Sequence, residues 1–581
     1  MSIFDERATA PGRARVPVSA DSASGERAVP VHRLLANGFA TQTTGPVFAL
    51  MGDANMYWLS DLSESLPIVY GRHEAGVVAM ADGFARANDR VGVCAVTCGP
   101  GVTNTLTSLR AAVINRTPLV VFAGDTPSNE VGHLQEFDTE AFAALAGACH
   151  IRIAHPGDAV SAVADAFETA RSERTPVILS VPMDVQEARV AGDADAEPAP
   201  VEVGSPPLEP SSTDVEALAR LLGGRRCVVL LGSGALDPAA LGEAAELADL
   251  LEGSVGNTIP ALGALARHPR SIGIVGGFST PAARSVLAAA EVVLVVGASL
   301  SRHTTDDEKL FPQALIARID TAPASRFADV DLHVRADARA TLSCLNRRLR
   351  DSPTSRPVGV RGDETPISRS MPDPYVDVVS VEERDKHGNL DPIRLMNALS
   401  EAVPGEAEIV VGAGHFWNYV VEGFTPRAAG RIQFHYQFGA IAQGFPAGLG
   451  VASTRPAAGT IALEGDGSLL MSLAEMETWA RHELPLLLFV LNDGAYGAEV
   501  HKLASRGHDP RSAVFGYTPF AGLATALGIE ASTPTSITDA EASVRNYFAH
   551  PRPMLIDARI SPYDISEMYG RFFTTPMAGR G

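Results

Sequence analysis

The sequence predicts an α/β fold made of three doubly wound parallel-sheet domains. Short apolar segments, often β-branched, alternate with helical segments from about Val31 onward, as expected for a parallel sheet covered by helices on both faces. Two Pro-rich stretches divide this alternation into three parts of similar size. The length of 581 residues, at about 150 residues per domain, and the 46% share of hydrophobic residues allow each part its own core.

The first predicted domain covers residues 30–190 and follows a polar tail at residues 1–29. Helical segments are predicted at residues 75–87 and 103–113. The predicted strands of this domain are residues 46–50, 91–97, 118–123 and 176–181.

A linker rich in Pro, Ala and Glu at residues 191–212 leads to a middle domain at residues 213–350. A second linker at residues 351–379 leads to a third domain at residues 380–565. A C-terminal tail at residues 566–581 is expected to pack as a lid. The predicted strands of the two domains are residues 227–231, 292–296 and 317–320, then 409–411, 460–463, 486–491 and 554–557.

Charge and cysteine content exclude several classes of protein. The 47 basic and 68 acidic residues give a net charge of −21, which argues against nucleic acid or an anionic membrane as partner. Five cysteines without a Cys-x-x-Cys pair argue against a disulfide framework or structural zinc and indicate a cytoplasmic protein. We expect no signal peptide, and the longest apolar runs, such as residues 484–491, are too short to cross a bilayer.

Two short motifs follow neighbouring apolar strands of the third domain. The first is Gly465-Asp466-Gly467-Ser468, and the second runs from Asn492 through Asp493, Gly494, Ala495 and Tyr496 to Gly497. Because ligands of an open parallel sheet bind at the carboxyl ends of its strands, both motifs are expected at one crevice.

The residue types in these motifs suit Mg²⁺ and a diphosphate. Asp466 and Asp493 can supply carboxylate oxygens to Mg²⁺, and a backbone carbonyl near Ala495 can supply another. Gly465 and Gly467 let the backbone approach phosphates, and the N–H groups of Gly467 and Ser468 at a helix N-terminus favour an anion. The alternative is a pair of ordinary strand–helix turns with Gly and Asx caps.

Together the two motifs resemble the Gly-Asp-Gly…Asn signature of thiamine diphosphate enzymes. The order of domains resembles the pyrimidine-binding, middle and diphosphate-binding domains of the acetolactate synthase and pyruvate decarboxylase superfamily. The resemblance implies thiamine diphosphate and Mg²⁺ as cofactors, with Tyr496 and Gly497 also at the cofactor. Asp493 stands where the family has a metal-binding Asn, which keeps an oxygen ligand and adds charge.

Glu74 is the candidate for activating the cofactor. It follows a strand, opens a helix and precedes the apolar residues Ala75, Val77 and Val78, so burial should let it hold a proton near neutral pH. The resemblance implies that Glu74 faces the aminopyrimidine ring and promotes removal of the thiazolium C2 proton. The alternative is a first-turn glutamate that stabilises a helix dipole.

Three further segments resemble cofactor-binding parts of the family. Gly99 and Gly101 belong to a Gly-Pro-Gly turn that, with Asn104, lies near the pyrimidine; the alternative is a turn followed by a helix capped by Thr103. Ile441 resembles the bulky residue that bends the cofactor, or is an ordinary core residue. Gly414 and His415 take the place of a Gly-Gln pair at the diphosphate; His415 otherwise caps a loop.

The candidate substrate residues point to two different reactions. Asp53 and Glu499 resemble carboxylates of simple 2-oxo acid decarboxylases, with an Asx turn and a solvated helix face as the alternatives. Gln135 resembles a residue of acetolactate synthase and related carboligases, and His133 stands beside it, although a lone His is more often structural.

The middle domain carries an incomplete dinucleotide motif. Gly232 and Gly234 follow a strand, but Asp237 replaces the third glycine. The resemblance to acetolactate synthases implies FAD in this domain, whereas residues 299–302 depart from their pattern, so FAD is left open.

The resemblance implies a homodimer or homotetramer, in which Glu74 of one chain and the metal motif of another form each site. The expected reaction is decarboxylation of a 2-oxo acid followed by addition to an aldehyde or ketone acceptor. The alternatives are a decarboxylase that releases an aldehyde and a non-catalytic cofactor-binding subunit.

Overall fold

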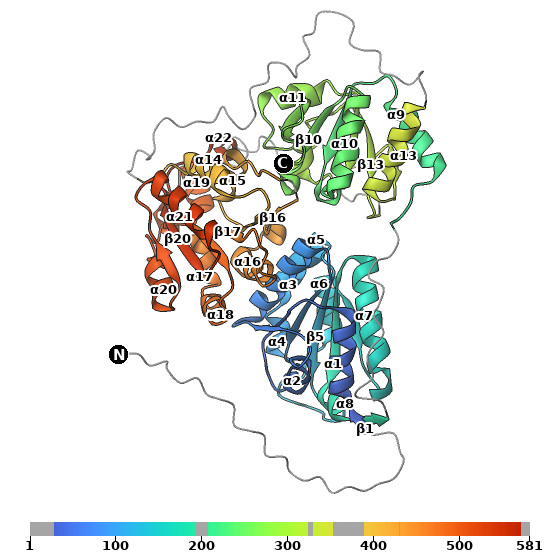
Figure 1. Ribbon diagram of the computed structural model, residues 1–581, viewed down its shortest axis with the longest axis vertical. Helices are drawn as coiled ribbons and strands as arrows, with labels where there is room; N and C mark the ends of the chain where they lie inside the picture. The colour runs from blue at the N-terminus through green and yellow to red at the C-terminus, as the bar shows by residue number, and fades with distance from the viewer. Residues whose placement is uncertain (1–27, 192–206, 324–328, 352–388, 429, 571–581) are drawn as a thin grey trace, which may run out of the picture.

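The computed structural model describes residues 28–191, 207–323, 329–351, 389–428 and 430–570. Figure 1 shows three α/β domains, each built on its own sheet. The predicted fold class is confirmed. Most of the predicted tails and linkers (residues 1–29, 191–212, 351–379 and 566–581) lies outside the described residues.

The N-terminal domain has a six-stranded parallel sheet in the order β3-β2-β4-β5-β7-β6. Helices α1 (Val31–Gln42), α2 (Met56–Leu62) and α7 (Ala159–Glu173) pack on one face, and α3 (Glu74–Asn88), α5 (Leu106–Asn115) and α6 (Thr139–Ala146) pack on the other. The strands are β2 (Val47–Ala49), β3 (Ile68–Tyr70), β4 (Gly92–Val96), β5 (Leu119–Asp125), β6 (Cys149–Arg152) and β7 (Pro176–Pro182). The short β1 (Ala28–Pro30) pairs antiparallel with β8 (Arg189–Ala191) and joins the two ends of the domain.

The middle domain has the strand order β11-β10-β9-β12-β13-β14, again entirely parallel. Helices α9 (Ser212–Leu222), α10 (Pro238–Leu250) and α13 (Ala338–Arg350) cover one face, and α11 (Pro281–Ala288) packs on the other. The strands are β9 (Cys227–Leu231), β10 (Ser254–Asn257), β11 (Ser271–Ile274), β12 (Val292–Val296), β13 (Leu315–Ile319) and β14 (Leu332–Val334).

The C-terminal domain has the parallel order β16-β15-β17-β18-β20-β19. Helices α14 (Pro392–Ala402), α15 (Trp417–Gly423) and α21 (Ile537–Ala549) lie on one face, and α16 (Gly444–Ala452), α18 (Glu475–Arg481) and α20 (Phe520–Ala526) lie on the other. The strands are β15 (Glu408–Val411), β16 (Ile432–Phe434), β17 (Thr460–Gly465), β18 (Leu486–Asn492), β19 (Glu530–Ser532) and β20 (Met554–Arg559).

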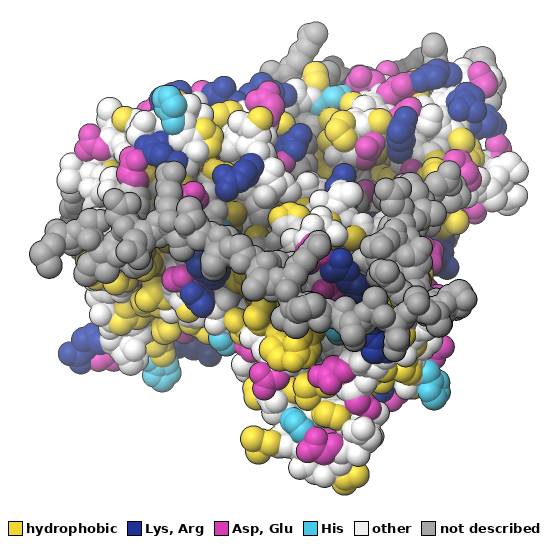
Figure 2. All heavy atoms as spheres, turned by 60° about the horizontal axis from the view of Figure 1, so that its bottom comes forward, with side chains coloured by type: hydrophobic (Ala, Val, Ile, Leu, Met, Phe, Trp, Pro, Cys, Tyr) yellow, Lys and Arg dark blue, Asp and Glu magenta, His cyan; other side chains and the backbone are white. Residues whose placement is uncertain are grey.

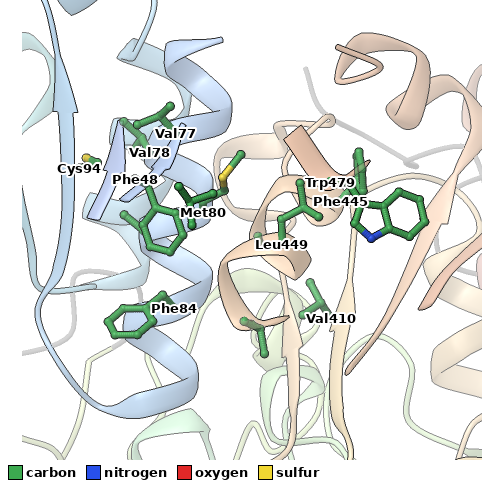
Figure 3. Packing of buried hydrophobic residues seen from close by; sticks show 14 of the residues in the cluster. Phe48, Val77, Val78, Met80, Phe84, Cys94, Val410, Phe445, Leu449 and Trp479 are labelled. Atoms are coloured by element: carbon green, nitrogen blue, oxygen red, sulfur yellow. The ribbon is translucent and has the colours of Figure 1, made fainter. Parts of the chain in front are cut away.

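The N- and C-terminal domains share one hydrophobic core where α3 packs against α16. Figure 3 shows Met80 of α3 pointing toward α16, which carries Phe445 and Leu449, while Phe48 and Phe84 fill the other side of α3 in the same cluster. The helices touch at their backbones, because a Cβ at Gly83 would lie 2.3 Å from the Ala447 carbonyl oxygen and one at Gly450 would lie 1.9 Å from that of Met80. The two domains are therefore packed directly against each other.

Among the described residues, no helix has the length and apolar content needed to cross a bilayer.

Candidate active site

Two acidic side chains meet where β17 and β18 end. These strands are parallel neighbours, and Asp466 follows β17 while Asp493 follows β18. Asp466 is only 2% exposed and Asp493 only 6%. The sequence prediction that the two motifs share one crevice is therefore met by the geometry.

Backbone N–H groups hold both carboxylates in place. Asp466 accepts hydrogen bonds from Gly467 at 2.8 Å and from Gly494 at 2.7 Å, and Asp493 accepts one from Ala495 at 3.0 Å. Burial, and next the neighbouring Asp493 carboxylate, raises the pKa of Asp466, and burial also raises the pKa of Asp493. A divalent cation between them would offset this repulsion.

Two carboxylates suit Mg²⁺, which binds few protein carboxylates and completes its shell with phosphate oxygens and water. Among the described residues, no group of three or more His, Cys, Asp or Glu side chains forms a metal site. The remaining oxygens would come from the backbone and the diphosphate. Ala495, the predicted carbonyl donor, is buried in the turn after β18 and forms a bridge to Val514.

A cavity of about 2510 Å³ opens at these strand ends. It extends to the carboxyl edge of the middle-domain sheet, where Ser233, Gly297 and Arg318 line it. It brings together the candidates of the C-terminal domain, namely Gly414, His415, Ile441, Gly465, Asp466, Gly467, Ser468, Asp493, Ala495, Tyr496, Gly497 and Glu499.

Three glycines of the two motifs line the cavity and are closely packed. A Cβ at Gly497 would lie 2.6 Å from the Asp493 carboxylate, and one at Gly465 would lie 2.7 Å from the Phe416 ring. A Cβ at Gly467 would lie 2.9 Å from the Tyr496 ring. These three glycines therefore allow the residues of the two motifs to pack closely on one another.

His415 presents an unpaired atom beside the metal motif. Its Nε2 lies 3.2 Å from the Tyr419 hydroxyl, whereas its buried Nδ1 has no hydrogen-bond partner among the described residues and lies 3.8 Å from Asp493 Oδ2. Burial lowers the pKa of His415 to about 4. His415 therefore lies against the metal motif, with its buried Nδ1 toward Asp493.

Sequence reasoning missed two residues that pack on His415. The His501 ring lies 4.6 Å from the His415 ring, and the Tyr569 ring lies 5.2 Å from it, between centroids. Burial lowers the pKa of His501 to about 3. Tyr569 belongs to α22 (Glu567–Tyr569), the end of the described chain, and its position could not be inferred from any local pattern.

Ile441 lies on a loop that the metal motif holds. The Ala442 N–H donates to Ser468 Oγ at 2.7 Å, and the Phe445 N–H donates to the Glu464 carboxylate at 2.9 Å. Burial raises the pKa of Glu464 to about 7. Glu464, absent from the predicted site, precedes Asp466 and ties the end of β17 to the start of α16.

Glu74 lies in the N-terminal domain, apart from this cavity. It opens α3, is 9% exposed, and accepts a hydrogen bond from Asn104 Nδ2 at 3.0 Å. Burial and position agree with the sequence prediction. Among the described residues that line the cavity, however, neither Glu74 nor Asn104 is present.

The Gly-Pro-Gly turn begins a short helix, α4 (Pro100–Thr103), and Gly99 takes a φ of 57°. Gly101 is the second residue of α4 and is buried. The alternative that Thr103 caps the following helix is wrong. Thr103 ends α4 and turns its hydroxyl back to the Pro100 carbonyl at 3.3 Å, while α5 starts at Leu106.

The substrate candidates of the N-terminal domain lie around this turn. The Cys98 thiol donates to Gln135 Oε1 at 3.3 Å, and a Cβ at Gly99 would lie 3.0 Å from that of Gln135. His133 Nδ1 accepts the Gln135 N–H at 3.2 Å, which is a local turn contact. Asp53 is exposed. Among the described residues that line the large cavity, none of these candidates is found.

Glu499 has a half-exposed side chain 3.8 Å from Lys502 Nζ. Glu499 lines the cavity and also lies on a solvated helix face. Its position is therefore compatible with a place at the substrate and with the alternative of a solvated helix residue.

The middle-domain motif does not fit a dinucleotide pyrophosphate at α10. Asp237 already caps this helix by accepting the N–H groups of Ala239 at 3.0 Å and Ala240 at 2.9 Å, and its negative charge would repel a phosphate. A Cβ at Gly232 would lie 2.2 Å from the Gly297 carbonyl oxygen, so these glycines serve loop packing.

Comparisons with known proteins agree with this arrangement. Residues 31–144, 215–345 and 412–558 match the thiamine pyrophosphate enzyme N-terminal TPP binding domain, central domain and C-terminal TPP binding domain.

The chain is 28% identical over 514 residues to the acetolactate synthase isozyme 1 large subunit of Escherichia coli (86% of this chain, 88% of the relative). It is 26% identical over 543 residues to a probable acetolactate synthase large subunit of Methanocaldococcus jannaschii (90% of each chain). It is also 28% identical over 538 residues to acetolactate synthase 1, chloroplastic, of Zea mays (88% of this chain, 82% of the relative). The chain belongs to the thiamine pyrophosphate enzyme family.

Proposed function

We propose that this protein uses thiamine diphosphate and Mg²⁺ to decarboxylate a 2-oxo acid and to join the remaining acyl unit to a second carbonyl compound. The observation that carries this proposal is the pair Asp466 and Asp493 at adjacent strand ends, in a cavity that glycines of both motifs also line. The similarity to acetolactate synthase large subunits supports the 2-oxo acid as the substrate class.

Each residue has a proposed task in this reaction. Asp466 and Asp493 would hold Mg²⁺, and the N–H groups of Gly467 and Ser468 would face the diphosphate. Ile441 would press on the bent cofactor. When bound, thiamine diphosphate supplies the carbanion that attacks the substrate carbonyl, and Glu74 would hold the proton that activates its pyrimidine ring.

We also propose that two chains combine to complete each site. The two half-sites of one chain lie apart, and exposed apolar residues surround both. Val131 and Leu134, beside Gln135, are 98% and 97% exposed, and Met471, in α17 (Asp466–Met471) after the metal motif, is 62% exposed. Figure 2 shows hydrophobic side chains uncovered between charged ones on the visible face. A second copy related by a two-fold axis would cover both regions and bring its Glu74 to the first chain's cavity.

A second candidate function is simple decarboxylation with release of an aldehyde. Glu499 favours it, because this carboxylate lines the cavity and can move a proton at the reacting carbon. The position of Gln135 over the Gly-Pro-Gly turn favours carboligation, since its amide can orient an acceptor. A non-catalytic subunit would have no use for Glu74, Asp466 and Asp493 together.

Product analysis separates these functions. The protein is incubated with a panel of 2-oxo acids, thiamine diphosphate and Mg²⁺, with and without an aldehyde acceptor. We expect acyloins or acetohydroxy acids. Aldehyde as the sole product would contradict carboligation and support the decarboxylase, and intact cofactor binding without turnover would support the non-catalytic subunit.

A further inference from the structure

Glu475, a buried carboxylate outside the cavity, holds the segment that carries Glu74. It begins α18 in the C-terminal domain and is 1% exposed. Its carboxylate accepts the Arg72 N–H at 3.1 Å and the His73 N–H at 2.9 Å. These amides belong to the turn between β3 and α3, directly before Glu74.

The turn is shaped to admit this carboxylate. A Cβ at Gly76 would lie 2.4 Å from Glu475 Oε1, so a larger residue there would displace the carboxylate. The Thr478 hydroxyl donates to Glu475 Oε2 at 2.7 Å and fixes its orientation. With three donors around it, the carboxylate has little freedom to move.

Other residues of the same segment hold the other side of the turn. The Tyr70 N–H donates to His482 Nε2 at 3.0 Å, and Arg481 donates to the Tyr70 carbonyl. Glu477 accepts a hydrogen bond from the Arg72 side chain and not from the backbone N–H groups of the turn. The backbone from Tyr70 to His73 is therefore fixed by the domain that carries the metal motif.

We propose that Glu475 is a positioning residue for Glu74. It sets where the activating carboxyl lies by holding the two backbone amides before it. Glu475 also lies on the same β17–β18 connection as Asp466. This inference rests on the proposed two-chain site. In that site Glu475 positions Glu74 of its own chain, and this Glu74 serves the cofactor bound by the partner. Glu475 would therefore connect the two active sites of a dimer.

The first test measures backbone hydrogen exchange in the protein without bound cofactor. Glu475→Gln keeps the size of the side chain but places an amide N–H₂ against the N–H groups of Arg72 and His73. We expect faster backbone deuterium exchange in peptides covering residues 70–76, by mass spectrometry. The matched control is Glu477→Gln, which faces the same turn, and it should leave this exchange unchanged. Equal exchange in both variants would overturn the proposal.

The second test uses mixed dimers made from two differently tagged chains. Glu74→Gln and Asp466→Ala chains should each be inactive alone, and their mixture should have one competent site. This site combines Glu74 of the Asp466→Ala chain with the metal motif of the Glu74→Gln chain. Glu475→Gln is then added to one chain or the other.

On the chain that supplies Glu74, Glu475→Gln should slow turnover about 10- to 100-fold, because small displacements of a catalytic group have effects of that size. On the chain that supplies the metal motif, it should leave turnover nearly unchanged. Equal loss in both placements would overturn the role of Glu475 alone. If the mixture of Glu74→Gln and Asp466→Ala chains were inactive, the proposal of a site shared by two chains would be overturned. The proposal that Glu475 connects two active sites would fall with it. If Glu475→Gln does not fold, Glu475→Asp, which draws the carboxylate back by one methylene, replaces it in the same mixtures.

Discussion

The carboxylate of Asp466 accepts the backbone N–H of Gly494 at 2.7 Å, so the end of β17 is tied directly to the turn after β18. This contact holds Asp466 beside Asp493 in a buried place where two negative charges repel each other. A bound cation would relieve that repulsion. The affinity for the metal therefore depends on pH and on the geometry of the two turns.

Magnesium affinity should rise with pH. Because burial raises the pKa of both aspartates, the metal-free pair holds a proton at neutral pH that Mg²⁺ must displace. We expect the apparent Kd for Mg²⁺ to fall between pH 6 and pH 8, by up to about tenfold per pH unit for one displaced proton. Asp493→Asn removes one charge and should flatten this dependence. Isothermal titration calorimetry with saturating thiamine diphosphate measures the Kd for Mg²⁺ at each pH, and the exposed Asp509→Asn is the control. An equal dependence of Kd on pH in the wild type and both variants would contradict the shared proton.

Glu74→Gln should remove ring activation without removing cofactor binding. An amide cannot exchange a proton with the pyrimidine nitrogen, so C2 deuterium exchange of bound thiamine diphosphate should slow about 100- to 1000-fold, within the range of acid–base catalysis. The cofactor Kd should change much less than the exchange rate, since the metal motif, which this substitution leaves intact, would hold the diphosphate. Nuclear magnetic resonance of quenched samples gives the exchange rate, with Glu64→Gln as an exposed control in the same domain. Fast exchange in the Glu74 variant would refute its role.

Ile441→Ala separates a cofactor-bending residue from a core residue. Ile441 lines the cavity, whereas Leu449 is fully buried in the core between α3 and α16. Leu449→Ala should destabilise the protein by about 2–5 kcal/mol through a new internal void. Ile441→Ala should lower kcat with little change in the unfolding midpoint. Thermal denaturation and steady-state kinetics distinguish them; a large loss of stability in Ile441→Ala with normal kcat would make it an ordinary core residue.

The imidazole of His501 should make the fold acid-sensitive. Its pKa is lowered by burial to about 3, so below its ordinary pKa the unfolded chain binds a proton that the folded chain does not. Stability due to this group is complete above about pH 6.5 and falls by roughly 1.4 kcal/mol per pH unit below it. His501→Phe should therefore show a smaller drop in Tm between pH 7 and pH 5. Scanning fluorimetry measures the difference, the exposed His508→Phe should behave as wild type, and an unchanged slope in His501→Phe would contradict the prediction.

Local patterns were enough to predict part of the site. Asp466, Asp493 and the glycines around them follow apolar strands, and parallel strands end at one edge of a sheet, so their meeting follows from sequence order alone. Glu74 was predicted to be buried because apolar residues follow it in the same helix. The alternative interpretation of Thr103 as a helix cap was wrong, because a turn and a helix start look alike in sequence and only the hydroxyl contact to Pro100 distinguishes them.

The sequence by itself determined three α/β domains, the metal motif and its family resemblance, because these depend on periodicity and short spacings. Only the tertiary structure decided that Glu475 holds the turn before Glu74, that His501 and Tyr569 pack on His415, and that the two half-sites of one chain lie apart. Those contacts join residues from separate elements, and the packing of α3 against α16 brings the Glu475 segment to the turn before Glu74.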